Sequence, residues 1–168
     1  EALVGRAMVL EREVLPAKTF RKLSAKERYA AASLALFILF HYLIGDLDPL
    51  VESGGKRSAL NRRAFRKLVE LIGPRKALLA GSGDSTWSDP AHLLACFFQL
   101  RRAFHYINAY VVGTSRPVES LRGRIWESVF TRDMRRFQLW MHRSVGRFPT
   151  LVLGPSGSGK ELVARAIG

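Results

Sequence analysis

The longest uncharged stretch of the chain runs for 17 residues, from Tyr29 to Gly45, and restricts the fold more than any other feature. A helix that is apolar on all sides must be buried, either inside a protein or in a membrane. A membrane-spanning helix needs about 20 apolar residues, whereas this stretch contains His41 and Tyr42 and is soon followed by Asp46. We therefore expect a buried core helix, with a membrane span as the alternative.

The start of this helix is marked by Ser24 and Glu27, which stand three residues apart. At this spacing a serine hydroxyl and a glutamate carboxylate each accept a hydrogen bond from the other residue's backbone N–H, an arrangement called a capping box. The sequence therefore predicts a helix that begins at Ser24 and continues to Gly45.

Two further helices are predicted by apolar residues that recur at helical spacing. The first ends at Gly73 and Pro74, and the second begins with Asp89 as cap and Pro90 at the first helical position and continues to Gly113. The apolar positions are Leu60, Ala64, Leu68 and Ile72 in the first, and Leu93, Phe97, Leu100, Phe104, Ile107 and Val111 in the second. The second seam suits a helical core or a dimer contact. Because it is shorter than three heptads, we expect a helical core.

Composition restricts partners and compartment. The 168 residues include 27 Lys and Arg against 14 Asp and Glu, a net charge of +13, which favours an anionic partner. A single cysteine, Cys96, allows no intrachain disulfide and is typical of a cytoplasmic protein. The four histidines show no metal-binding spacing, so we expect no zinc site; they are His41, His92, His105 and His142.

A glycine-rich loop near the end of the sequence carries the strongest chemical signal. A short apolar run at 150–153 predicts a β-strand, and the residues from Lys160 onward predict a helix. The segment between them matches the phosphate-loop pattern G-x-x-x-x-G-K. Its glycines let backbone amides point at phosphate oxygens, and Lys160 adds a charge for the terminal phosphates. The candidate nucleotide-binding residues are Gly154, Pro155, Ser156, Gly157, Ser158, Gly159, Lys160 and Glu161.

The residue after the lysine separates the known kinds of phosphate loop. Most loops have Ser or Thr there, whose hydroxyl holds Mg²⁺, whereas this chain has Glu161. With Glu161 and the Leu-Val-Ala-Arg-Ala-Ile that follows, the segment resembles the opening of the AAA+ ATPase module of bacterial sigma-54-dependent transcriptional activators. The loop also resembles that of ABC-type ATPases, but those continue with Ser or Thr.

The resemblance extends upstream and covers 121–168. Residues 128–145 resemble the helix that begins the same module, and their apolar positions lie on one helical side; these are Phe130, Met134, Phe137, Met141 and Val145. Pro155 and Ser158 depart from the family pattern, and Pro155 removes one backbone donor from the loop. We therefore expect a mostly α region at 1–113, a linker at 114–120, and at 121–168 the start of an α/β P-loop (AAA+) domain.

The resemblance implies a function for the longer protein of which we expect this chain to be a fragment cut at both ends. It implies an ATP- and Mg²⁺-dependent regulator that assembles into a homo-oligomeric ring and remodels sigma-54 RNA polymerase. It also implies promoter DNA binding through a C-terminal domain outside these 168 residues. We expect no catalytic residue here and no ATP hydrolysis by this segment, and Glu161 is the candidate Mg²⁺ ligand.

A different class of function remains open. A basic helical module could bind nucleic acid or an anionic membrane while the glycine loop stays idle. The expected helix at 128–145 and the residues after it carry a basic stripe that suits either a nucleic-acid contact or a solvated face; its members are Arg132, Arg135, Arg136, Arg143 and Arg147.

Overall fold

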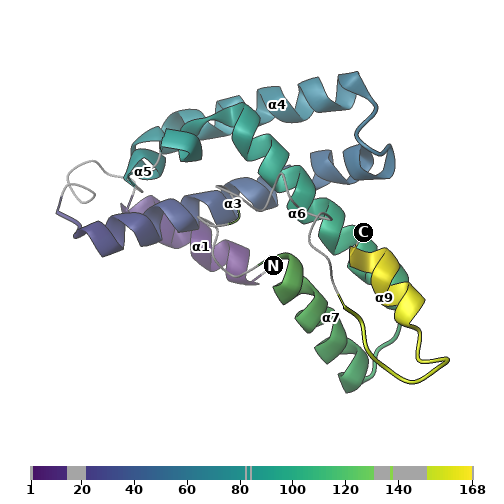
Figure 1. The fold of residues 1–168 in the computed structure, drawn as a ribbon. Coiled ribbons are helices and arrows are strands. Elements are labelled where there is room, and N and C mark those ends of the chain that lie inside the picture. Colours follow the sequence, from purple (N-terminus) through teal and green to yellow (C-terminus); the bar gives the residue numbers. More distant parts are fainter. Residues whose placement is uncertain are drawn as a thin grey trace. The chain divides into compact units, whose positions relative to one another are not determined.

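The computed structural model of the chain describes residues 2–14, 22–81, 83, 85–130, 137 and 151–167. Its elements are all helical (Figure 1): α1 (Ala2–Val14), α3 (Ala25–Glu52), α4 (Ser58–Ile72), η1 (Gly73–Arg75), α5 (Lys76–Ala80), η2 (Ser85–Ser88), α6 (Pro90–Tyr110), α7 (Arg116–Val129) and α9 (Lys160–Ile167). The chain divides into two compact units, the first Glu1–Phe97 and the second Phe98–Gly168.

Helix α3 begins with the predicted capping box. The backbone N–H of Glu27 donates to Ser24 Oγ at 3.3 Å, and the backbone N–H of Ser24 donates to Glu27 Oε2 at 2.7 Å, which confirms the prediction. The helix passes Gly45 and ends at Glu52, with Pro49 in its last turn. A proline costs least near a helix end, because few backbone bonds remain to be broken beyond it.

Helix α3 is the centre of the first unit and contacts α1, α4 and α5 (Figure 1). Its buried residues are Ala31, Ala32, Ala35, Leu36, Ile38, Leu39, Leu43, Asp46, Leu47, Leu50 and Val51. By length and composition alone, α3 is the one helix among the described residues that could cross a membrane, and 50% of its most apolar window is buried within the protein. The core-helix interpretation therefore stays a prediction.

The predicted second and third helices are present as α4 and α6. In α4, Ala64, Leu68 and Ile72 are buried, and the helix ends at Ile72, before the predicted Gly73. Helix α6 begins at Pro90, as predicted, and the N–H of Ala91 donates to Asp89 Oδ1 at 3.0 Å.

The apolar seam of α6 is buried at every predicted position except one. Leu93 and Phe97 are fully buried, while Phe104 is 46% exposed. The other three seam positions are also buried: Leu100, Ile107 and Val111. Burial within a single chain favours core packing over a dimer contact.

The second unit has a small core of its own. The buried residues Ile107, Val111, Ile125 and Ala166 bring together α6, α7 and α9. The turn between α6 and α7 is fixed by Arg122, which donates to the carbonyls of Val111 at 3.1 Å and Gly113 at 2.7 Å. Helix α9, which follows the glycine loop, is therefore packed against a defined surface.

The expected fold class, a mostly α region followed by the start of an α/β P-loop (AAA+) domain, is wrong. The described residues contain no β-strand, so this part of the chain is all-helical. A strand needs a neighbour for its backbone N–H and C=O groups, and no described segment pairs with residues 151–153. Leu151 and Leu153 are each 81% exposed, so no packing compensates for the missing ladder.

The remaining sequence expectations meet the structure in part. Ser128 lies near the end of α7 instead of opening a helix, and Phe130 has an extended backbone. Most of the helix expected at 128–145 lies outside the described residues. Helix α7 begins at Arg116, inside the expected linker, and the compact units divide within α6. The domain boundaries at 113 and 121 stay a prediction.

Candidate functional site

The glycine loop at 154–159 contains two glycines with left-handed backbone. Gly157 has φ +75° and Gly159 has φ +77°, angles that residues with a side chain rarely adopt. Between them, Ser158 donates a hydrogen bond from Oγ to the carbonyl of Pro155 at 2.8 Å. The loop therefore curls back on itself immediately before α9.

Gly154 lies close to two side chains of this curl. A Cβ atom placed at Gly154 would lie 2.9 Å from Ser158 Oγ and 3.9 Å from the Lys160 side chain. Contacts under 3.0 Å force a shift of the neighbouring atom. A side chain at this position would therefore displace the Ser158 hydroxyl, whereas its contact with Lys160 would be an ordinary van der Waals one.

Lys160 closes the loop from the other side. Its Nζ donates to the carbonyl of Gly154 at 2.9 Å and to the carbonyl of Pro155 at 2.5 Å. No carboxylate among the described residues forms an ion pair with it. Two neutral carbonyls satisfy the ammonium donors but leave its positive charge uncompensated, so the charge remains available to an anion.

Helix α9 begins at Lys160, so the loop lies against a helix N-terminus. The N–H groups of the first helical residues lack acceptors in the helix pattern. Among the described residues, the N–H of Leu162 donates to the carbonyl of Gly159 at 3.0 Å, and the N–H of Val163 makes the first regular helix bond to the same carbonyl at 3.4 Å. Ala166 anchors the other end of α9 in the core of the second unit. The arrangement combines a helix dipole, free amides and one cation.

Glu161 is the one carboxylate placed at the loop by the sequence, and it is exposed in the first turn of α9. Mg²⁺ is commonly held by one or two carboxylates together with substrate phosphates. Among the described residues no group of three or more His, Cys, Asp or Glu side chains could hold a metal by itself. Glu161 could therefore contribute to a Mg²⁺ site only together with a bound phosphate.

The other predicted residues form no second site of this kind. Cys96 Sγ lies 3.7 Å from His92 Nε2, but burial raises the pKa of the thiol to about 12, which keeps it protonated at neutral pH. His41 bonds through Nδ1 to the carbonyl of Phe37, one turn back. His142 and the basic stripe from Arg132 to Arg147 lie outside the described residues.

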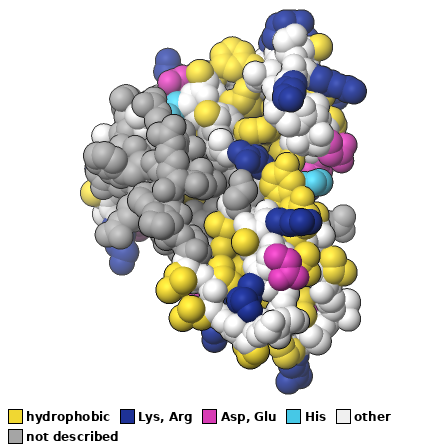
Figure 2. All heavy atoms as spheres, turned by 45° about the vertical axis from the view of Figure 1, so that its right-hand side comes forward, with side chains coloured by type: hydrophobic (Ala, Val, Ile, Leu, Met, Phe, Trp, Pro, Cys, Tyr) yellow, Lys and Arg dark blue, Asp and Glu magenta, His cyan; other side chains and the backbone are white. Residues whose placement is uncertain are grey.

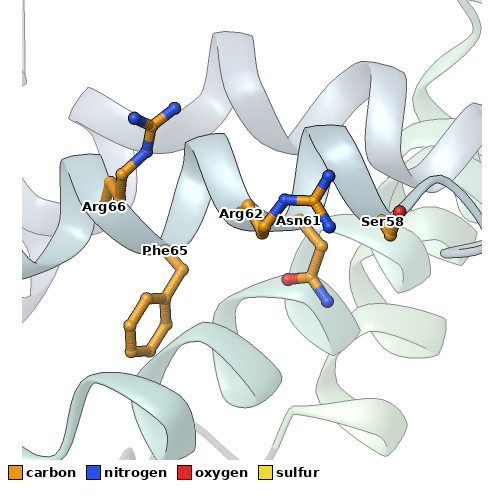
Figure 3. A pocket seen from close by; sticks show the side chains of 5 residues that line it. All are labelled: Ser58, Asn61, Arg62, Phe65 and Arg66. Atoms are coloured by element: carbon orange, nitrogen blue, oxygen red, sulfur yellow. The ribbon is translucent and has the colours of Figure 1, made fainter.

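One surface was missed from the sequence. A groove beside α4 is lined by Ser58, Asn61, Arg62, Phe65 and Arg66, whose side chains are drawn in Figure 3. The sequence predicted only the apolar side of α4. The signal that could have located the groove is Phe65, an aromatic residue outside the buried stripe and flanked in sequence by arginines.

Comparison of the chain with protein-family models, with curated proteins and with solved structures finds no match to any of them. The function proposed below therefore rests on the residues of the chain and on the resemblance of its glycine loop to that of sigma-54-dependent activators.

Proposed function

We propose that residues 154–161 bind the phosphates of ATP, and that the chain is the ATP-binding part of a regulator that acts on sigma-54 RNA polymerase. The observation that carries the proposal is the loop itself, in which two left-handed glycines and the uncompensated charge of Lys160 adjoin the start of α9. Anions bind at such helix ends because backbone N–H groups and the helix dipole both favour negative charge.

Each residue of the loop has a distinct part in this proposal. The amides of Lys160 and Glu161 donate to phosphate oxygens, and the ammonium of Lys160 exchanges its two carbonyl acceptors for the terminal phosphates. The donors belong to the loop and the helix, so binding requires no strand before residue 154. Pro155 provides no N–H, and its carbonyl instead holds Ser158 in place.

Mg²⁺ would neutralise part of the phosphate charge when it is bound with ATP. Glu161 is the residue that would contact it, directly or through water, because it replaces the hydroxyl residue usual at this position. The chain offers no arginine finger or second acidic motif that its sequence identifies, so we propose binding without hydrolysis by these 168 residues.

The wider role rests on the resemblance of residues 154–167 to the ATPase module of sigma-54-dependent activators. No match to a known protein supports it. This role consists of a homo-oligomeric ring in the cytoplasm, remodelling of sigma-54 RNA polymerase, and promoter DNA binding through a domain outside this sequence. ATP binding is the part of this role that the present chain can test by itself.

The test is calorimetric titration of the 168-residue chain with ATP and Mg²⁺. A charge-assisted contact contributes about 1.5 to 3 kcal/mol, so Lys160→Ala should weaken binding by about 10- to 150-fold. Arg165→Ala is the matched control, because it removes one exposed cation from the same helix, beyond the first turn. Equal ATP affinity in the wild type and Lys160→Ala, or an equal loss in both variants, would contradict the proposal.

A further inference from the structure

The cations of α4 fall into two pairs with different surroundings. Arg63 and Lys67 both form ion pairs with the buried Asp46, at N–O distances of 2.8 and 2.6 Å. These two side chains therefore hold α4 against α3 and balance a buried carboxylate. Their charge serves the fold of the first unit.

Arg62 and Arg66, one helical turn apart, have no such role. Both are exposed, and no hydrogen bond or ion pair within the described part of the chain involves either one. Glu70 lies one turn beyond Arg66, but the two side chains form no ion pair in the described part of the chain. Figure 2 shows Lys and Arg side chains spread over this face of the molecule from its top to its bottom. The two guanidinium groups are available to an anion.

An aromatic ring lies in the same groove as these arginines. Phe65 is 38% exposed, and Figure 3 shows Phe65 and Asn61 pointing to the same side of α4. Ser58 lines the groove at the start of the helix, where no side chain caps the first N–H groups. Two cations, an exposed ring and two polar side chains thus lie along α4, and Figure 3 shows Arg66 directed to the opposite side of the helix from Phe65 and Asn61.

We propose that this groove binds single-stranded nucleic acid. Proteins that bind single strands combine cations that follow the backbone with aromatic rings on which bases stack. Arg62 and Arg66 supply the first element and Phe65 supplies the second, while Asn61 and Ser58 offer hydrogen bonds to bases or sugars. The net charge of +13 attracts a polyanion over a longer range.

Other occupants fit the groove less well. A second copy of this chain would carry the same positive charge toward it, so charge complementarity disfavours self-association. A membrane surface requires a wide apolar face, and the exposed large apolar residues of α4 are limited to Phe65 and Val69. An acidic peptide would pair with the arginines, but nothing in it would require the exposed ring.

The test measures binding of a fluorescent oligothymidine to the full chain by anisotropy at several salt concentrations. Arg62→Gln with Arg66→Gln should weaken binding at least tenfold at low salt and reduce the salt slope by about 1.4, since each single-strand phosphate contact contributes about 0.7. The matched control is Arg6→Gln with Arg12→Gln, which removes two exposed cations from α1 in the same unit.

Phe65 provides a second readout that charge alone does not affect. Stacking of one base on an aromatic ring contributes a factor of about five or more, so Phe65→Leu should weaken binding by that factor and Phe65→Trp should preserve it. Circular dichroism checks that each variant is folded.

Three results would overturn the proposal. One is equal binding by the wild type and the double arginine variant, and another is an equal loss in the α1 control. The third comes from a parallel measurement with vesicles that contain phosphatidylserine. If the double arginine variant binds these vesicles more weakly but binds oligothymidine as the wild type does, the groove binds a membrane surface instead. Lys160→Ala should leave oligothymidine binding unchanged, so failure of the ATP proposal and failure of this one can be told apart.

Discussion

The charged groups in the core of the first unit and the cation of the glycine loop in the second unit are balanced in different ways. In the first unit, Arg75 forms a buried ion pair with Glu11 from α1, and the buried Asp46 of α3 forms ion pairs with two cations of α4. In the second unit, Lys160 contacts only backbone carbonyls in an exposed loop. A charge that is neutralised inside the fold stabilises it, whereas a charge satisfied by neutral acceptors can still attract a ligand. Stability and binding should therefore respond to different substitutions.

The largest expected effect is on the rate at which the buried thiol of Cys96 reacts with an alkylating reagent. Burial raises the pKa of Cys96 from 9.0 to about 12, and only the thiolate reacts with alkylating reagents. At pH 8 the thiolate population should be about 1000-fold smaller than for an ordinary cysteine, because each pKa unit changes it tenfold. Iodoacetamide should thus label Cys96 very slowly in the native chain and quickly in 6 M guanidinium. Rapid native labelling would contradict the buried core described for the first unit.

Breaking the buried ion pair should cost more stability than removing the loop cation. Arg75→Ala leaves the carboxylate of Glu11 buried without a partner and should lower the free energy of unfolding by about 3 to 5 kcal/mol. Lys160→Ala lies on an exposed loop and should change it by about 0.5 kcal/mol or less. Urea titration compares the two. Glu11→Leu with Arg75→Met should recover much of the loss, and no recovery would mean that Arg75 acts through packing alone.

Two phenylalanines of the α6 seam provide a finer comparison. Phe97 is fully buried and lies 5.6 Å from the ring of Phe40, so Phe97→Ala should cost about 3 to 5 kcal/mol. Phe104 is 46% exposed and touches the ring of Trp126 edge-on, so Phe104→Ala should cost about 1 kcal/mol. Thermal unfolding of both variants measures the difference. Equal losses would show that the seam is packed uniformly, contrary to the structure.

The capping box should have a modest effect on stability with a distinctive pH dependence. Ser24→Ala should lower stability by about 0.5 to 2 kcal/mol at pH 7. Hydrogen bonds from the Ser24 side chain and backbone hold the pKa of Glu27 below its usual 4.5. Their stabilisation is present above that value and is lost as the pH falls through the lowered pKa. The loss of stability caused by Ser24→Ala should therefore become smaller as the pH falls through the pKa of Glu27. A loss that stays constant with pH would show that the Glu27 carboxylate does not contribute to the cap.

These features differ in how far the sequence could predict them. The capping box, the end of α4 near Gly73 and the start of α6 depend on residues within one or two turns, and the sequence predicted them. The partnership of Glu11 with Arg75 joins residues 64 positions apart and left no local pattern. Phe104 matched the spacing of the α6 seam but is exposed, because periodicity identifies a side of a helix without identifying what covers it.

The predicted strand at 150–153 failed for a related reason. Apolar residues next to a glycine turn favour an extended chain, and residues 151–155 have no helical structure. A β-strand requires hydrogen bonds to a distant neighbour, which local sequence cannot supply. The glycine loop depends on local backbone freedom, and Gly157 and Gly159 have the positive φ angles for which glycine is suited.

The most direct test of the central claim keeps every charge and changes only the shape of the loop. Gly159→Val places a β-branched side chain at φ +77°, a backbone angle that such residues rarely adopt, so the loop is strained. Titration of the folded variant with ATP and Mg²⁺ should show no detectable binding where the wild type binds, although Lys160 is intact. An unchanged ATP affinity would contradict the assignment of residues 154–161 as a phosphate-binding loop.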